Sequence, residues 1–410
     1  MSDPIIREFP IEEFSAMNSE MALHELIRHA TDIQASDLFL HTNERSTDIC
    51  IRRLGMMQRL LVVSLEQGRQ LIGHVKAMAD MDIAEHRRPM DGRWIHEDEG
   101  NRYDLRINSL ATLFGEDMTI RLWDRQMGLR SIDELGLTRE EIGTLKGMLS
   151  NPSGLILVTG PTGTGKTTTL YACLKHLNDG SRKISTLEDP IEFALSGVRQ
   201  SQIQPKLGLD FPELLRNVLR QAPDVIMIGE IRDEHTAETA VRAANSGHLV
   251  LATLHAPVAA GAIQSLLALG SHPHFLSGSL LGVVAQRLIR TLCPSCRIAY
   301  DISVAPETFA DIKSLLTADE GKVIYGPGQC DDCFNIGYGG RTGLFEILTM
   351  TRDLRQLISS ARPTEDIERE AIRHGMLEFK RSAMLRVAKG VTSTEEILRD
   401  VPPEYLGLED

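Results

Sequence analysis

The chain has 410 residues and a formal net charge of −13, and 42% of its residues are hydrophobic. This length predicts two or three domains with cores of ordinary size. The acidic balance argues against a protein whose main task is to coat DNA or RNA. The N-terminus has no apolar segment of signal-peptide length, and the most apolar stretch, residues 276–288, is interrupted by Ser, Gly and Gln. We therefore expect a cytosolic protein.

The first 125 residues are expected to form a short lead and a small α+β domain. Residues 1–20 are polar and weakly patterned, whereas residues 21–125 carry helix-like and strand-like periodicity. The expected helices are residues 21–30 and 65–81, and the expected strands are residues 37–41, 48–52, 58–63, 102–108 and 117–123. Residues 91–93, Asp-Gly-Arg, are interpreted as a turn.

Residues 126–140 lack a sustained pattern and contain Gly128 and Gly136, so we interpret them as a linker. The residues that follow predict a helix over residues 139–149. Asp133 or Thr138 is expected to cap this helix at its N-terminus.

From Gly154 onward, short apolar strands alternate with helices, which indicates a mostly parallel sheet covered on both faces. The expected strands are residues 155–159, 183–187, 225–228 and 249–253. Beyond about residue 300 we expect helices and loops. The expected helices there are residues 367–371, 376–388 and 393–399, the last capped by Thr392 or Ser393. The pattern predicts one C-terminal α/β domain over residues 141–410.

A glycine-rich loop stands between the first of these strands and the next helix. Gly160, Gly165, Lys166 and Thr167 fill the pattern G-x-x-x-x-G-K-[ST] of a phosphate-binding P-loop. Backbone N–H groups of such a loop bind phosphates, and the helix N-terminus adds the positive end of a dipole. Lys166 is expected to reach the β- and γ-phosphates of ATP, and the Thr167 hydroxyl to bind Mg²⁺. The predicted nucleotide-binding residues of the loop are Gly160, Pro161, Thr162, Gly163, Thr164, Gly165, Lys166, Thr167 and Thr168.

Acids and histidines flank three further strands. Glu188 and Asp189 end one strand, Glu230 follows another, and His248 and His255 flank a third. Open parallel sheets bind ligands at the carboxyl ends of their strands. Carboxylates there can hold Mg²⁺ or orient a water molecule, and histidines can contact the γ-phosphate. A single such acid is more simply a surface carboxylate or a helix cap, but several on separate strands favour a composite site.

Four cysteines form two C-x-x-C pairs: Cys293 with Cys296, and Cys330 with Cys333. Four thiolates suit a closed tetrahedral Zn²⁺ site, and cytosolic proteins do not normally keep disulfides. A redox pair is the alternative, but neither pair clearly opens a helix after a strand. We predict a structural zinc element within residues 290–335.

Taken together, the motifs resemble those of the secretion ATPases of type II secretion systems and type IV pili. The resemblance covers about residues 21–400 and is carried by residues 160–169, 186–192, 219–233, 247–255, 285–290 and 337–341, with Glu346. It implies a RecA-like P-loop NTPase domain preceded by a smaller, PAS-like α+β domain. It also implies site roles for residues outside the loop: catalytic for Glu230, Glu188 and His255, and nucleotide-binding for Asp189 and His248.

The family is also described by arginines of its N-terminal domain that clamp the phosphates. The resemblance points to Arg106 and Arg121 as the best candidates here. From the residues alone, surface salt bridges are the simpler interpretation of both.

The resemblance implies an ATP-hydrolysing motor that works as a homohexamer. It would drive an inner-membrane platform protein and so assemble a type IV pilus or a type II secretion pseudopilus, peripherally at the inner membrane of a bacterium. Within the family, the cysteine element favours assembly over a retraction-type pilus ATPase. A nucleic-acid translocating or conjugation ATPase is the alternative of another class. We expect no nucleic-acid partner, because no basic stripe with stacking aromatics is evident.

Overall fold

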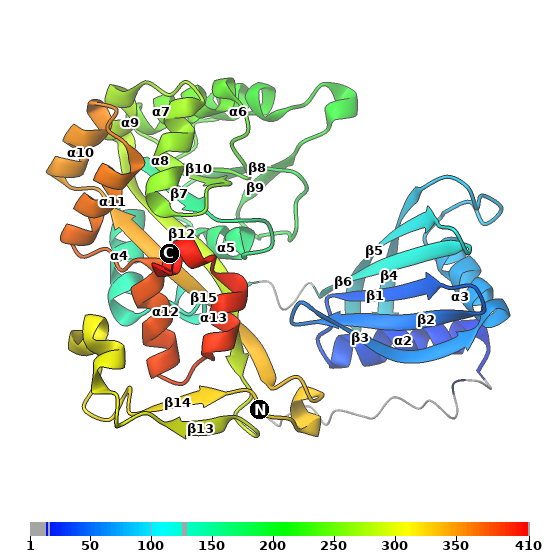
Figure 1. Cartoon of the computed structure of the whole chain (residues 1–410). Helices are drawn as coiled ribbons and strands as arrows, with labels where there is room; N and C mark the ends of the chain where they lie inside the picture. The colour runs from blue at the N-terminus through cyan, green and yellow to red at the C-terminus, as the bar shows by residue number, and fades with distance from the viewer. Residues whose placement is uncertain (1–13, 15–16, 99, 125–128, 409–410) are drawn as a thin grey trace. The chain divides into compact units, whose positions relative to one another are not determined.

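The computed structural model describes residues 14, 17–98, 100–124 and 129–408. The chain divides into two compact units, Met1–Gly128 and Leu129–Asp410 (Figure 1). Each unit has its own sheet, and they are described separately below.

The first unit is a six-stranded antiparallel sheet with two helices packed on it and on each other. The strand order is β3-β2-β1-β6-β5-β4. Asn18 and Ser64 cap the two helices by accepting hydrogen bonds from backbone N–H groups of the first turn. The elements are α2 (Ser19–Asp32), β1 (Asp37–Thr42), β2 (Ser46–Arg53), β3 (Met56–Ser64), α3 (Leu65–Met78), β4 (Met90–Asp98), β5 (Asn101–Ala111) and β6 (Glu116–Asp124).

The interpretation of residues 91–93 as a turn is wrong, because they lie within β4 and pair with β5. Gly92 lies close to the side chains of Met81 and Ala79. A Cβ at this position would lie 2.5 Å from the Sδ atom of Met81, a separation that real Cβ atoms do not show. Gly92 therefore marks a close approach of neighbouring side chains to a strand and not a turn.

Part of the segment interpreted as a linker packs into the second unit. Ile132, Leu135 and Leu137 are buried in a core cluster with Phe345. A short 3₁₀ turn, η1 (Ile132–Glu134), precedes α4 (Arg139–Leu149), which Thr138 caps. Residues 125–128 lie outside the described residues.

The second unit is built on a seven-stranded sheet in the order β15-β12-β7-β11-β10-β8-β9. Strand β15 pairs antiparallel with β12, and the other pairs are parallel. Its strands are β7 (Gly154–Thr159), β8 (Ile184–Glu188), β9 (Arg199–Gln202), β10 (Val225–Ile228), β11 (Leu249–Leu254), β12 (Leu280–Leu292) and β15 (Tyr338–Thr349). The helices between these strands in the chain are α5 (Lys166–Leu177), α6 (Phe211–Leu219), α7 (Glu234–Asn245), α8 (Ala259–Ala268) and α9 (Pro273–Ser279).

This sheet is buried on both faces. Leu155 and Leu157 of β7 point into one core cluster, with helices α6, α7 and α8, while Ile156 and Val158 point into the other, with α4 and α5. Covered parallel strands of this kind appear in a sequence as continuous apolar runs, and those runs located β7, β8, β10 and β11 correctly.

The expectation of only helices and loops beyond about residue 300 is wrong. The chain there also forms β14 (Val323–Gly326), which pairs with β13 (Ile298–Asp301), and the long strand β15. Glycines at the start of β15 obscured its strand pattern. The last helices are α10 (Arg352–Ser359), α11 (Thr364–Arg373), α12 (Phe379–Ala388) and α13 (Thr394–Asp400).

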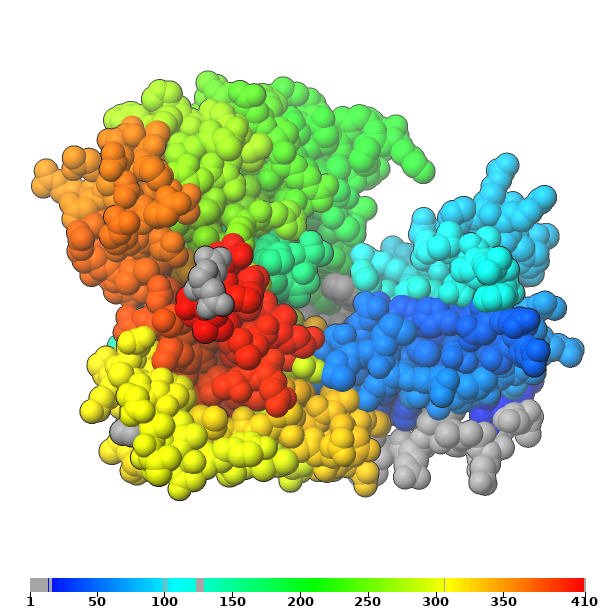
Figure 2. Space-filling view, in the orientation of Figure 1, coloured from blue at the N-terminus to red at the C-terminus, as the bar shows by residue number. Residues whose placement is uncertain are grey.

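Ser393 caps α13, as expected. Figure 2 shows the C-terminal residues (red) on the surface of the second unit, beside the segment that carries β13 and β14 (yellow). In the described part of the chain, no helix is both long enough and apolar enough to cross a bilayer.

Candidate active site

The glycine-rich loop connects the carboxyl end of β7 to the N-terminus of α5. Gly160, Gly163 and Gly165 have φ of 143°, 82° and 87°, a region that favours glycine. A Cβ on Gly160 would lie 2.4 Å from the carbonyl oxygen of Gln286. Pro161 is exposed at the loop's outer surface, with Thr162 and Gly163 beside it. The loop therefore presents backbone groups at the start of a helix, as phosphate binding requires.

The ammonium group of Lys166 lies over this loop. Its Nζ donates to the carbonyl oxygens of Gly160 (2.7 Å) and Pro161 (3.0 Å), and it is 3.3 Å from Nδ1 of His255. Burial lowers the pKa of Lys166, and the nearby charge of Glu230 opposes that shift. The P-loop and the segment after β11 thus meet at one point.

Glu230 stands two residues beyond β10 and contacts the side chains of Arg232 and His255. Its Oε1 is 2.8 Å from Nε2 of His255, and its Oε2 is 2.6 Å from Nη2 of Arg232. Burial raises the pKa of Glu230. The hydrogen bond from Arg232 and the charges of His255 and Lys166 outweigh burial, so the net pKa lies below its usual value. Glu230 is therefore held ionised, as an acceptor for a proton or a hydrogen bond from water must be.

Sequence reasoning did not single out Arg232, although it lies in a quoted motif. The guanidinium of Arg232 also approaches Asp189, with 3.9 Å between Nη1 and Oδ2. The Asp189 side chain is 40% exposed, so its carboxylate is open to solvent at the end of β8. Arg232 joins the acids that follow two separate strands.

Glu188 is surrounded by donors from the protein itself. The Tyr171 hydroxyl donates to Oε2, while Thr186 Oγ1 (2.5 Å) and Gln200 Nε2 (3.0 Å) contact Oε1. Glu188 is 3% exposed. Burial and the bond to Glu188 raise the pKa of Tyr171, so the phenol remains the donor. With both carboxylate oxygens engaged, Glu188 is suited to orienting the end of β8 beside Asp189.

Two further buried side chains support the loop and were missed. Gln286 of β12 donates from Nε2 to the Thr164 carbonyl (2.7 Å), and its Oε1 accepts from Thr169 Oγ1 (2.7 Å). Thr159 Oγ1 accepts from the N–H of Ala256 (2.8 Å), next to His255. These contacts join residues separated by about a hundred positions or more, and no local pattern indicates them.

Thr167 and Thr168 begin α5 on the side of the loop that is open to solvent. Thr167 is exposed and Thr168 is half-buried. An exposed Thr167 hydroxyl and the exposed Asp189 carboxylate are oxygen donors of the kind that Mg²⁺ prefers.

His248 is not brought to this site. It precedes β11, and its carbonyl accepts the N–H of Gly154 at the start of β7. Gly160 follows the other end of that strand, about 20 Å away at ~3.3 Å per residue. His248 Nδ1 lies 3.0 Å from the carbonyl of Ala243, a local contact.

The candidate arginines lie in one row across the sheet of the first unit. Arg106 is directly opposite Arg93 on β4 and Arg121 on β6. Arg121 pairs with Asp37 (Nε–Oδ1, 3.3 Å), and Arg93 pairs with Asp104 (Nε–Oδ1, 2.8 Å). Arginines of three neighbouring strands therefore lie side by side, and two of them are paired with an acid.

The four cysteines of the second unit converge. Cys293 and Cys330 have Sγ atoms 3.8 Å apart, Cys296 and Cys333 3.7 Å, and Cys330 and Cys333 3.6 Å. Thiolates at ~2.3 Å from one tetrahedral Zn²⁺ would be separated by about 3.8 Å. The four thiols therefore fit a zinc ion.

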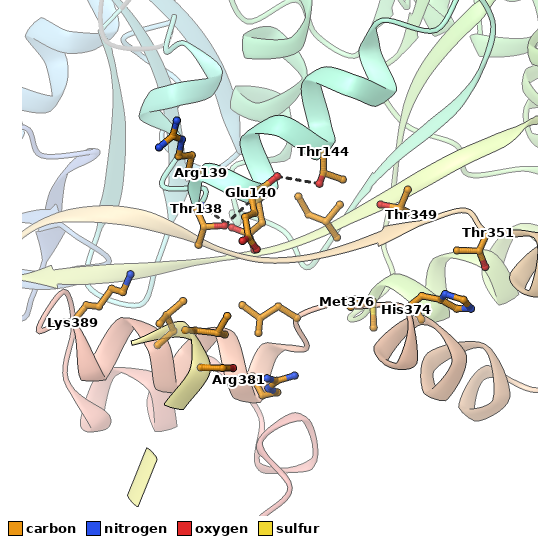
Figure 3. Close-up of a pocket in the computed structure, with 18 residues that line it drawn as sticks. Thr138, Arg139, Glu140, Thr144, Thr349, Thr351, His374, Met376, Arg381 and Lys389 are labelled. Carbon is orange, nitrogen blue, oxygen red and sulfur yellow. Dashed lines mark hydrogen bonds between the residues drawn. The ribbon is translucent and has the colours of Figure 1, made fainter. Parts of the chain in front are cut away.

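A cavity of about 750 Å³ lies elsewhere in the second unit (Figure 3). Glu140 of α4 and its N-cap Thr138 lie on one side of it, and Arg381 of α12 and its C-cap Lys389 on the other. The P-loop residues, all of which are described, are not among those that line it.

The P-loop, the acids after β8 and β10 and the histidine after β11 define the second unit as a P-loop ATPase domain. Residues 13–399 match the family described as type II/IV secretion system protein. The chain therefore belongs to this family, and it is an ATPase. The resemblance stated from the motifs is confirmed.

Two relatives illustrate the match. The chain is 39% identical over 377 residues to the type II secretion system ATPase E of Vibrio cholerae, covering 92% of this chain and 74% of that protein. It is 36% identical over 378 residues to the type IV pilus assembly ATPase TfpB of Acinetobacter baylyi, covering 92% and 64%.

Solved structures show the same fold. The Legionella pneumophila ATPase DotB superimposes with a TM-score of 0.68 at 21% identity, covering 92% of this chain and 94% of that one. The pilus retraction motor PilT with bound ADP gives 0.63 at 24% identity, covering 94% and 98%. The predicted fold class, a P-loop α/β domain preceded by a smaller domain, is confirmed.

Proposed function

We propose that this ATPase is the motor that assembles a type IV pilus or a type II secretion pseudopilus. The names of its relatives and the intact catalytic constellation support this proposal. The observation that carries it is the continuous contact from Lys166 through His255 to Glu230 and Arg232, which joins the ends of separate strands around the P-loop.

The residues take the following roles in hydrolysis. Backbone N–H groups of residues 160–168 and the Lys166 ammonium bind the phosphates of ATP. Glu230 accepts a hydrogen bond from the attacking water and draws away its proton as the oxygen approaches the γ-phosphorus. His255 contacts the γ-phosphate region. Glu188 fixes the end of β8 from which Asp189 reaches the site.

We also propose that the protein binds two metal ions. Thr167 and Asp189 would hold Mg²⁺, which neutralises phosphate charge when bound. Cys293, Cys296, Cys330 and Cys333 would hold one structural Zn²⁺. In line with the family resemblance, the cysteine element favours assembly over retraction.

Arg106 and Arg121 are proposed to contribute positive charge to the phosphates. In this proposal the protein acts as a homohexamer on the cytoplasmic side of the bacterial inner membrane, where it drives a membrane-embedded platform protein. Rotation of one unit against the other during the ATPase cycle would supply the stroke.

The test is genetic and uses the full chain. In the source bacterium, we expect deletion of the gene to abolish a surface pilus or the release of a secreted protein. The wild-type gene should restore that phenotype and the Lys166→Ala gene should not. Full complementation by Lys166→Ala, or a deletion strain with both processes intact, would contradict the proposal.

A further inference from the structure

A buried carboxylate on β15 joins two helices of the second unit. Glu346 is 1% exposed, and its Oε1 accepts a hydrogen bond from the N–H of Ala259 (2.7 Å), the first residue of α8. The backbone N–H of Phe379, the first residue of α12, also faces this carboxylate and favours its ionised form. One side chain thus contacts the N-termini of two helices that are more than a hundred residues apart.

Neither helix is capped by its own sequence. In the described part of the chain, the residues at the N-cap positions, Val258 and Glu378, make no side-chain capping bond. The first N–H groups of a helix need acceptors, and a negative charge there interacts favourably with the helix dipole. Glu346 supplies both to α8 and α12.

Helix α8 begins four residues after His255. The intervening loop, residues 255–258, is fixed at one end by Thr159, whose Oγ1 accepts the N–H of Ala256 (2.8 Å). It is fixed at the other end where Ala259 donates to Glu346. Thr159 directly precedes the P-loop, so the loop is held between the phosphate-binding strand and β15.

We propose that Glu346 is a positioning residue for ATP hydrolysis, which holds the loop that carries His255 and links that loop to α12. This inference rests on the role of His255 in the proposed function. Glu346, which is 1% exposed, acts through the two helix N-termini.

The electrostatic surroundings make this link sensitive to pH. Burial raises the pKa of Glu346 to about 7, and the charges of Glu368 on α11 and Glu378 before α12 add to the shift, while the two N–H groups oppose it. Arg287 of β12 is a cation that interacts with it electrostatically. Protonation converts one carboxylate oxygen into an O–H donor, so the group keeps less capacity to accept hydrogen bonds and loses the negative charge that favours both helix N-termini.

The first test is kinetic and uses the full chain. We expect Glu346→Gln to lower kcat by between about 10-fold and 100-fold. The double variant with His255→Ala should be no slower than His255→Ala alone, because both changes remove the same contribution. Glu395→Gln, on the exposed first turn of α13, is the matched control and should retain wild-type kcat.

The second test is the pH profile. Wild-type kcat should rise through an apparent pKa near 7, and Glu346→Gln should lack that rise. Glu368→Gln removes a neighbouring negative charge, so it should move the rise to lower pH without touching His255.

Hydrogen exchange distinguishes positioning from a general loss of stability. In Glu346→Gln, the amides of residues 259–262 and 379–382 should exchange faster while the core of β10 keeps its protection. Unchanged exchange at both helices, or additive losses in the double variant, would overturn the proposal. If His255→Ala alone keeps full activity, the assigned role of His255 fails instead.

Discussion

The Nε2 atom of His255 lies 2.8 Å from Oε1 of Glu230, although the two residues follow different strands. The other ring nitrogen faces Lys166 at 3.3 Å. One imidazole therefore bridges the P-loop cation and the acid that is held ionised at the end of β10. This bridge makes the P-loop, the acid and the histidine one site.

Removal of either candidate clamp arginine should slow hydrolysis while the protein remains folded. We expect Arg106→Ala and Arg121→Ala each to lower kcat by about 100-fold or more. The Arg121 side chain is 58% exposed, but its partner Asp37 is 6% exposed and would keep the Ser36 hydroxyl as a donor, so Arg121→Ala should cost about 1–3 kcal/mol and lower the thermal midpoint without unfolding the protein. Steady-state kinetics and thermal unfolding on the same samples check this. Arg59→Ala, on β3 of the same sheet, is the control and should keep wild-type kcat. An equal loss of kcat in all three variants would contradict a specific role of Arg106 and Arg121 at the phosphates.

Loss of the Tyr171 hydroxyl should disturb the buried acid at the end of β8. Tyr171→Phe leaves Glu188 with one donor fewer, and an incompletely satisfied buried carboxylate costs about 1–3 kcal/mol. Turnover should fall as well, because Asp189 follows Glu188 directly. Urea unfolding and turnover measure the two effects. Tyr300→Phe, at an exposed position, should change neither. A Tyr171→Phe protein identical to wild type in both measurements would show that this network does not matter.

The cysteine cluster should contain about one zinc ion per chain. Cys333→Ser should lose most of the bound metal and lower the thermal midpoint, because four-coordinate structural zinc contributes folding free energy. Elemental analysis of the purified protein gives the stoichiometry. Cys50→Ser, at a cysteine outside the cluster, should keep the zinc. Four freely reactive thiols in metal-free wild-type protein would disprove the zinc site.

The raised pKa of Glu346 predicts a pH-dependent difference in stability. The folded value is about 7 against an ordinary value of 4.5, so folding favours the protonated acid. The resulting stabilisation is complete below about pH 4.5 and is lost as the pH rises through 7. Glu346→Gln removes this dependence. Its free energy of unfolding, relative to wild type, should therefore increase between pH 4.5 and 7 and then level off. Urea titrations across this range check it, and a constant difference would argue against an unusually basic carboxyl.

Local patterns located most of the site, and long-range contacts account for what was missed. The P-loop is contiguous, and the acids and His255 follow apolar strands whose parallel pairing brings their carboxyl ends together. His248 precedes β11, so it lies at the opposite end of the strand from the P-loop. Gln286 and Glu346 bond to partners about 90 to 120 residues away in the sequence. The residues next to them in the sequence do not indicate such contacts.

The measurement that tests the central claim most directly is ATP hydrolysis by purified Glu230→Gln protein. The account predicts a kcat at least about 100-fold below wild type, with nucleotide binding and the thermal midpoint retained, because the amide cannot take up the proton of the attacking water. Glu234→Gln, exposed four residues further along, should hydrolyse ATP at the wild-type rate. Near-normal turnover by Glu230→Gln would contradict the assignment of this site.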